Sequence, residues 1–201
     1  MGRVRTVTTT RLPRPLEPRE ITALRASALA MGRPDVWAAM SFLRETGLRI
    51  AEACAITTGE ASTWPVPPRW CRTPGCRRHA RAALRVIGKG DRERVIVLSP
   101  EALRSADVLL GVTANGRMFP WTDRGARFLF SQVGDAAGVD VWPHRFRHTL
   151  ASELIESGVA IEIVADMLGH STTEITRLYW IASERSKVAA LSRRHRWLRR
   201  H

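Results

Sequence analysis

The segment of residues 142–180 concentrates side chains that could act on a phosphate group. It contains His144, Arg147, His170 and Tyr179, and Tyr179 is the only tyrosine of the chain. Arginine and histidine side chains stabilise the charge that builds up on a phosphate in a transition state. A tyrosine hydroxyl is a competent covalent nucleophile. The combination predicts cleavage of a phosphodiester by an oxygen atom of the protein.

Two other segments carry residues that suit the same chemistry. Lys89 lies between two glycines and is one of only two lysines, with Lys187, among 32 basic residues. A lysine can protonate a leaving oxygen, whereas an arginine hardly gives up a proton. Arg49 and Glu52 stand three residues apart and would share one face of a helix. No acidic cluster that could hold two metal ions stands out, so we expect chemistry that needs no metal.

Each of these residues also has an ordinary structural interpretation. Tyr179 alone would be an aromatic side chain at the edge of the core, with its hydroxyl hydrogen-bonded. Arg49 and Glu52 would form a surface ion pair, and Lys89 would be an exposed turn residue. Only their joint occurrence favours a catalytic role.

The positive charge of the chain indicates a polyanionic partner. The formal net charge is +13 over 201 residues, and the isoelectric point is about 11.4. Such a surface favours nucleic acid, and membrane or ribosomal surfaces are the alternatives. No long apolar run and no apolar leader at the N-terminus are seen. We therefore expect a cytoplasmic protein that binds double-stranded DNA rather than a membrane.

The elements that must position these residues can be read from periodicity and from glycine and proline punctuation. The pattern predicts a mainly α-helical protein with one small antiparallel β-hairpin. Helices are expected at residues 18–30, from Pro34 to Gly47, around residues 48–56, at 100–110 with Ser99 as the N-cap, at 123–137, at 143–157 and around 161–168, and hairpin strands at 84–87 and 94–98.

The helix predicted at 143–157 carries the first half of the basic cluster. Phe146, Leu150 and Leu154 form its apolar stripe, and His144, Arg147 and His148 are expected to point away from that stripe. In the next helix Ile161, Val164, Met167 and Leu168 form an apolar face, and Gly169 ends it. Ser171 to Glu174 reads as a capping box for a further helix that carries Tyr179.

Four ordered motifs resemble a known family. They are TGLRIAE, GKGDRERVIVL, HRFRHTLAS and MLGHSTTEITRLYW, and they extend from Thr46 to Trp180. This order is similar to that of the tyrosine recombinases, which include the phage integrases and the Xer-type site-specific recombinases. The resemblance implies their catalytic-domain fold, strand cleavage through a 3′-phosphotyrosyl link, and no metal or nucleotide cofactor. It covers roughly residues 16–185.

The resemblance also assigns a role to each matching residue. Arg49, His144, Arg147 and His170 would contact the scissile phosphate, Glu52 would support the site, Lys89 would be the general acid for the leaving 5′-oxygen, and Tyr179 would be the nucleophile. It further implies assembly as a tetramer on DNA, with a second recombinase or an accessory protein as further partners, and association with the bacterial nucleoid during activity.

The domain organisation departs from the usual family pattern. Typical members carry an N-terminal core-binding domain, whereas here the catalytic-domain pattern begins after a basic tail at residues 1–16. We expect residues 17–201 to form the catalytic domain and the core-binding domain to be absent, as in the fimbrial phase-switch recombinases or in a truncated gene. A catalytically silent regulator of a recombinase is the alternative function, and a type IB topoisomerase-like enzyme is a second one.

An inserted loop rich in Cys, Pro and Trp is predicted at residues 57–80. Cys71, Cys76 and His79 could be three ligands of a structural zinc ion, with Cys54 or water as the fourth. The spacing is not that of a standard zinc finger, so a basic loop with free thiols is the alternative.

Overall fold

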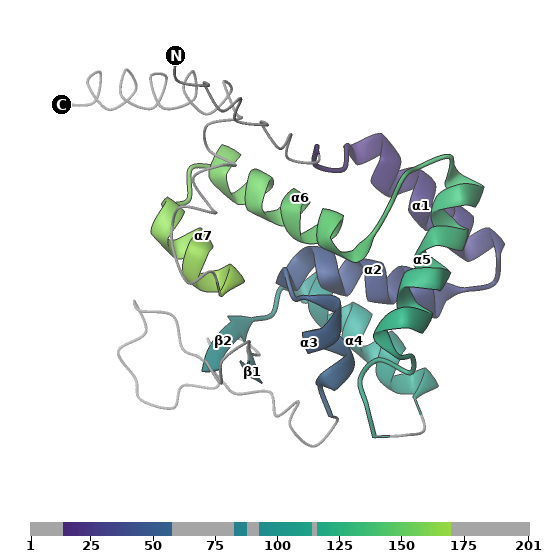
Figure 1. The fold of residues 1–201 in the computed structure, drawn as a ribbon, viewed down its shortest axis with the longest axis horizontal. Helices are drawn as coiled ribbons and strands as arrows, with labels where there is room; N and C mark the ends of the chain where they lie inside the picture. Colours follow the sequence, from purple (N-terminus) through teal and green to yellow (C-terminus); the bar gives the residue numbers. More distant parts are fainter. Residues whose placement is uncertain (1–13, 58–82, 88–92, 114–115, 170–201) are drawn as a thin grey trace, which may run out of the picture.

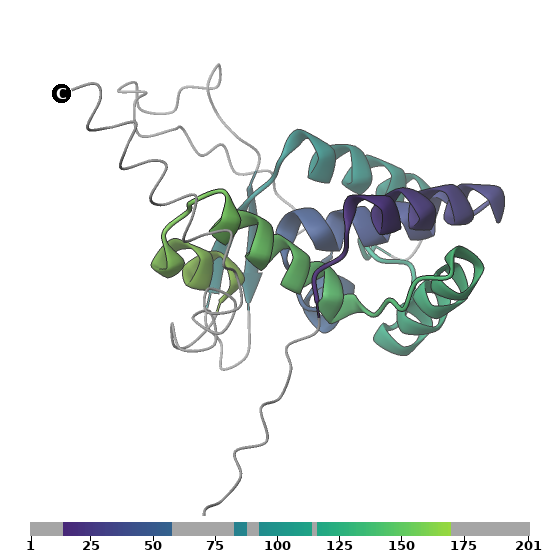
Figure 2. The same cartoon turned by 90° about the horizontal axis from the view of Figure 1, so that it is seen from above.

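A computed structural model describes residues 14–57, 83–87, 93–113 and 116–169. These ranges form seven helices and one two-stranded antiparallel sheet (Figures 1 and 2). The elements are α1 (Pro18–Ala30), α2 (Pro34–Thr46), α3 (Ile50–Ala55), β1 (Ala83–Ile87), β2 (Glu93–Val97), α4 (Pro100–Val112), α5 (Asp123–Ala137), α6 (Pro143–Glu156) and α7 (Ile161–Leu168). The mainly α-helical fold with a small hairpin that the sequence predicts is confirmed.

Helix α2 is the centre of the fold. It packs against α1, α4, α5 and α6, and Figure 1 shows these helices around it. Val36, Met40, Phe42 and Leu43 of α2 are fully buried, so this helix is apolar on nearly all sides. Neighbouring helices thus meet on its surface, and the main core of the protein forms there.

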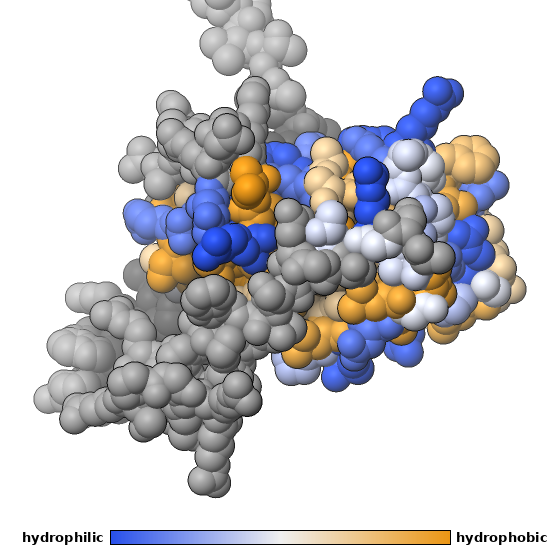
Figure 3. Space-filling model, turned by 90° about the horizontal axis from the view of Figure 1, so that it is seen from below, coloured by the Kyte–Doolittle hydropathy of each residue, from blue (hydrophilic) through white to orange (hydrophobic). Residues whose placement is uncertain are grey.

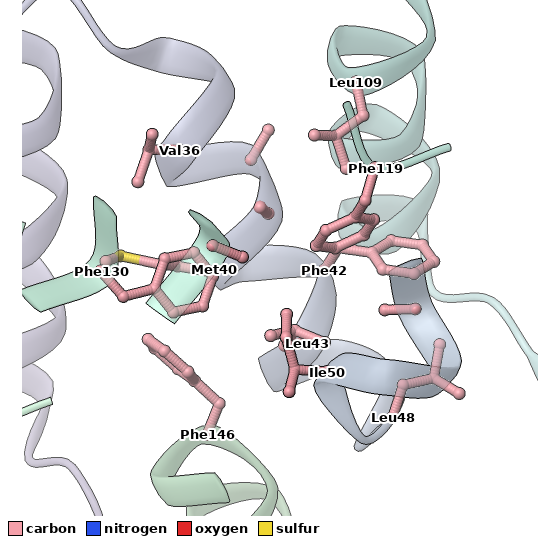
Figure 4. Close-up of a cluster of buried hydrophobic side chains, with 14 of the residues drawn as sticks. Val36, Met40, Phe42, Leu43, Leu48, Ile50, Leu109, Phe119, Phe130 and Phe146 are labelled. Atoms are coloured by element: carbon pink, nitrogen blue, oxygen red, sulfur yellow. The ribbon is translucent and has the colours of Figure 1, made fainter. Parts of the chain in front are cut away.

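Aromatic side chains fill the main core in two places (Figure 4). The ring centroids of Phe42 and Phe119 are 6.1 Å apart, and those of Phe130 and Phe146 are 5.9 Å apart, both edge to face. Edge-to-face pairs at such distances add about 0.5–1.5 kcal/mol to the energy of burial. Phe146 ties the first turn of α6 to α5, and this contact fixes the start of the helix that carries the basic cluster.

A smaller apolar cluster joins α6 to α7. Ala151 and Ile155 of α6 and Val164 and Leu168 of α7 are buried together. Helix α6 thus lies against α2 on one side and α7 on another. Met167, which the sequence placed on the apolar face of α7, is 37% exposed.

The hairpin has one buried and one exposed face. Its register pairs Leu84 with Ile96 and Val86 with Arg94, so these four residues share a face. Leu84, Val86 and Ile96 are buried on it, whereas residues of the other face such as Val95 are exposed. Both views place the hairpin beside α7, which contacts β2 (Figures 1 and 2).

The outer surface of the described ranges carries apolar side chains in separate places. Ile87 on β1, Phe128 on α5 and Ile163 on α7 are each more than half exposed. On the face seen in Figure 3, hydrophobic residues lie in several groups between hydrophilic ones. Within the described ranges, no helix has both the length and the apolarity that a membrane crossing requires.

Candidate active site

Four of the seven residues predicted for the site lie within the described ranges. Arg49 and Glu52 belong to the start of α3, and His144 and Arg147 belong to the first turns of α6. Lys89, His170 and Tyr179 lie outside the described residues, so their places stay predictions. The same holds for Cys71, Cys76 and His79 as zinc ligands.

Arg49 and Glu52 form the first contact of the site. Arg49 is the N-cap of α3, and Glu52 is its third residue. The Glu52 carboxylate accepts the Arg49 backbone N–H at 2.9 Å and the Arg49 Nη1 at 2.9 Å. The Glu52 side chain is 8% exposed and that of Arg49 is 34% exposed. The ion pair that the ordinary structural interpretation expects is present, although Glu52 is buried and not at the surface. It fixes both the backbone and the guanidinium of Arg49.

Arg94, which the sequence analysis did not select, is the second partner of Glu52. Its Nη2 lies 2.7 Å from Glu52 Oε2, and its Nη1 lies 3.2 Å from Oε1. Burial alone would raise the pKa of Glu52, but the hydrogen bonds from Arg94, Arg49 and the backbone outweigh it and lower this pKa. Glu52 is therefore a charged carboxylate held between two arginines.

The turn that carries Arg49 depends on Gly47. This residue ends α2 with φ of +64°, a conformation that favours glycine. A Cβ atom there would lie 2.5 Å from Leu168 Cδ2 and 2.9 Å from Leu150 Cδ2. The side chains of α6 and α7 therefore pack directly on the turn before Arg49.

Arg147 joins the same turn to the end of α7. It is 5% exposed, and it donates from Nη1 to the Gly47 carbonyl at 2.7 Å and from Nη2 to the Leu168 carbonyl at 2.5 Å. The expectation that Arg147 points away from the buried side of α6 is wrong, because α2 and α7 cover that helix on two sides. Arg147 thus fixes the segment before Arg49 and the segment two residues before His170.

The two histidines of α6 are kept neutral at neutral pH. Burial lowers the pKa of His144, and the positive charges of Arg147, Arg127 and Arg49 lower it further. Burial and then the charges of His144 and Arg147 lower the pKa of His148 to about 4. The positive charges of several arginines therefore act around His144, as expected for a site that receives a phosphate.

The described ranges contain no group of three or more His, Cys, Asp or Glu side chains that could hold a metal ion. Cys54, which with water is one of the two candidates for the fourth ligand of a zinc ion, is buried in α3. Burial raises the pKa of its thiol to about 11, so it is protonated at neutral pH.

The protein family of the chain follows from its match to a family model. The phage integrase family matches residues 21–185. The chain belongs to the phage integrase family. It is 30% identical over 173 residues to the tyrosine recombinase XerC of Corynebacterium efficiens, which covers 79% of this chain and 50% of that protein. The chain thus spans about half the length of curated relatives such as this one.

Solved structures of integrases and recombinases have the same fold. The catalytic domain of bacteriophage HP1 integrase matches with a TM-score of 0.64 and 22% identity, over 89% of this chain and 93% of that one. The XerH recombinase bound to its palindromic difH substrate matches with a TM-score of 0.67 and 18% identity, over 94% and 55%. The predicted fold, that of a tyrosine recombinase catalytic domain, is confirmed.

Proposed function

We propose that this phage integrase family member is a site-specific DNA recombinase. It cleaves and rejoins DNA strands through a 3′-phosphotyrosyl intermediate, in integration, excision or inversion. The observation that supports the proposal best is the partial exposure and partial hydrogen bonding of the Arg49 side chain. Among the described residues, Glu52 engages only Nη1 of its side chain, so Nε and Nη2 remain for a ligand. A partly exposed arginine with a fixed backbone and two unengaged nitrogens suits a phosphate.

The proposed reaction needs one nucleophile and one acid. The Tyr179 Oη attacks the phosphorus and gives its phenolic proton to a neutral imidazole of the site or to water. The bond to the 5′-oxygen breaks, and Lys89 gives that oxygen its proton. The energy of the broken bond is kept in the phosphotyrosyl ester, so a 5′-hydroxyl can reverse the step without a cofactor. Arg49, His144 and His170 hold the phosphate oxygens whose charge increases.

Arg147 has two roles in this proposal. Its two carbonyl bonds hold the segments before Arg49 and His170 in place. The family motif also assigns Arg147 a contact with the scissile phosphate, so in this proposal it would both hold these segments and donate to the phosphate.

We propose double-stranded DNA as the substrate. The net charge of +13 favours a polyanion, and the Tn1549 transposon integrase, which has a similar fold, has been solved in complex with circular intermediate DNA. Residues 17–201 would be the catalytic domain, with residues 57–80 as an inserted segment and residues 1–16 as a basic tail. A tetramer on DNA would bring four such sites together, with a second recombinase or an accessory protein as further partners.

The proposal is tested by trapping the intermediate. The full chain is incubated with nicked duplexes tiled across the DNA that flanks its own gene, with a chelator present. The cleaved strand end diffuses away at the nick, so the covalent product accumulates and is seen on a denaturing gel. We expect an adduct with the wild type and none with Tyr179→Phe, although both bind DNA. An adduct with Tyr179→Phe, or none with the wild type, contradicts the proposal.

The role of Lys89 is tested with a changed leaving group. Lys89→Ala should cleave an ordinary strand slowly, because a 5′-alkoxide needs a proton to leave. A bridging 5′-sulfur leaves as a thiolate without a proton, so Lys89→Ala should then approach the wild-type rate. Failure of the rescue would make Lys89 a phosphate contact and not the acid.

A further inference from the structure

Arg94 occupies an unusual place in the hairpin. In the register of the sheet it faces Val86 and lies on the buried side with Leu84 and Ile96. Its side chain is 10% exposed. An arginine at an inward position of a short strand costs desolvation unless its charge is compensated. The compensation comes from Glu52, which lies on α3, 42 residues before Arg94.

The contacts of Arg94 show what it can and cannot do. Both of its terminal nitrogens are engaged by the one carboxylate of Glu52, at 2.7 and 3.2 Å. It therefore has little to offer a phosphate directly. Its effect reaches Arg49, because Glu52 binds Arg94 and Arg49 at the same time. Arg94 therefore holds in place the Glu52 carboxylate that orients Arg49.

Arg94 also contacts the end of α7. Gly169 has φ of +66°, and a Cβ atom there would lie 3.0 Å from Arg94 Nη1 and 3.1 Å from its Cδ and Cζ. The guanidinium thus packs on the residue that directly precedes His170. It also extends from β2, the strand that follows Lys89 in the chain. One side chain therefore connects the segments of three residues that are proposed for the site.

We propose that Arg94 is a positioning residue for strand cleavage, acting through Glu52 on Arg49 and through Gly169 on the segment of His170. This inference rests on the proposed function. Misplacing a catalytic group by about 1 Å can cost roughly 100-fold in rate. We therefore expect Arg94→Gln to slow adduct formation by roughly 10-fold to 100-fold with DNA that is already bound. Arg94→Lys should recover part of the rate, since it keeps the charge but loses the two-pronged contact.

The dependence on pH separates positioning from a general loss of stability. In Arg94→Gln, Glu52 keeps its burial but loses its strongest favourable contact, so its pKa rises. The charged groups left around it are Arg49 on its own helix and, further away, the cluster near His144. As the pH falls, Glu52 of the variant becomes protonated before Glu52 of the wild type. The ratio of the variant rate to the wild-type rate should therefore fall with falling pH.

The experiment measures single-turnover adduct formation against pH for the wild type, Arg94→Gln, Arg94→Lys and Glu52→Gln, with thermal unfolding of each. Arg85→Gln is the matched control, because Arg85 lies on the exposed face of the same hairpin in an ion pair with Glu93. We expect Glu52→Gln to be slow without the added pH dependence, and Arg85→Gln to keep the wild-type rate and profile.

The outcomes are distinguishable. If the wild type forms an adduct and both Arg94 variants cleave at its rate, the positioning role is wrong. A ratio of the Arg94→Gln rate to the wild-type rate that does not fall with falling pH also contradicts it. If Arg94→Gln does not fold, the rate of Arg94→Lys decides, and a rate equal to that of the wild type contradicts the positioning role. If the wild type forms no adduct on any duplex, the proposed function fails, and a positioning role in cleavage fails with it.

Discussion

Two glutamates, Glu20 and Glu52, occupy equivalent local positions in different parts of the molecule. Each is the third residue of its helix, and each accepts the backbone N–H of the N-cap, at 2.8 Å from Glu17 and 2.9 Å from Arg49. Each is also bound by two arginines. We call Arg14, Glu20 and Arg145 the α1 triad, and Arg49, Glu52 and Arg94 the α3 triad.

The two triads differ in how fully their arginines are engaged. In the α1 triad Arg145 is 4% exposed and donates to the carbonyls of Arg14 and Asp140 and to both oxygens of Glu20. This arginine closes the start of α1 onto α6, which is a structural task. In the α3 triad Arg49 is a third exposed, and only one of its side-chain nitrogens has a partner among the described residues. The same local arrangement completes the fold at α1 and, in the proposed function, presents an arginine to a phosphate at α3.

The largest effect should come from removing the exposed arginine of the α3 triad. We expect Arg49→Ala to slow adduct formation roughly 100-fold to 1,000-fold, because a donor to the developing phosphate charge is lost. Arg14→Ala is the matched control, since Arg14 is the more exposed arginine of the α1 triad, and it should cleave at the wild-type rate. Equal rate losses in the two variants would remove the functional difference between the triads.

The next effect concerns the turn that presents Arg49. Gly47→Ala and Gly32→Ala place a Cβ atom at nearly the same φ, +64° and +66°, but only Gly47 has neighbours within 4 Å. Both variants carry the cost of a positive φ, and Gly47→Ala adds a clash with Leu168 and Leu150. We expect it to lose about 1–3 kcal/mol more stability than Gly32→Ala. Denaturant unfolding measures the difference, and equal losses would contradict the close packing of α7 on this turn.

A smaller effect should appear when the α1 triad is titrated. Burial would raise the pKa of Glu20, but hydrogen bonds from Arg14 and the backbone, with the charge of Arg145, lower it to about 2. Because the folded pKa lies below the unfolded one, this stabilisation is complete above about pH 4.5 and is lost as the pH falls through about 2. The melting temperature of the wild type should therefore fall in this window, and that of Glu20→Gln should fall less. An equal fall in both would exclude Glu20 as a source of acid sensitivity.

Much of the framework that holds these triads could be predicted from the sequence. Proline and glycine punctuation locates α1 and α2, and Gly47 does end α2 as predicted. Ser99 is the N-cap of α4, and its side chain accepts the Ala102 N–H. These features are local, so a short window of sequence contains the residues that determine them. Helix α4 extends two residues past the predicted end and runs through Gly111, which does not stop it.

The contacts of the site itself could be predicted only in part. Arg49 and Glu52 are neighbours in sequence, so their pairing could be found. Arg94 and Glu52 are 42 residues apart, and no spacing rule links them. One signal was available, because alternation along the predicted strand puts Arg94 on the same face as Ile96. The burial of Arg147 could not be read from one helix, since it depends on how α2 and α7 cover α6.

We propose that Glu52 serves the chemistry and that Glu20 serves the fold. The most direct test compares Glu52→Gln with Glu20→Gln, each measured for unfolding free energy and for single-turnover adduct formation per folded molecule. Both variants should lose on the order of 1–3 kcal/mol of stability, since each weakens a buried charged hydrogen bond. We expect Glu52→Gln to form adduct at least about tenfold more slowly than the wild type, and Glu20→Gln to keep the wild-type rate. Equal adduct rates in the two variants would contradict it.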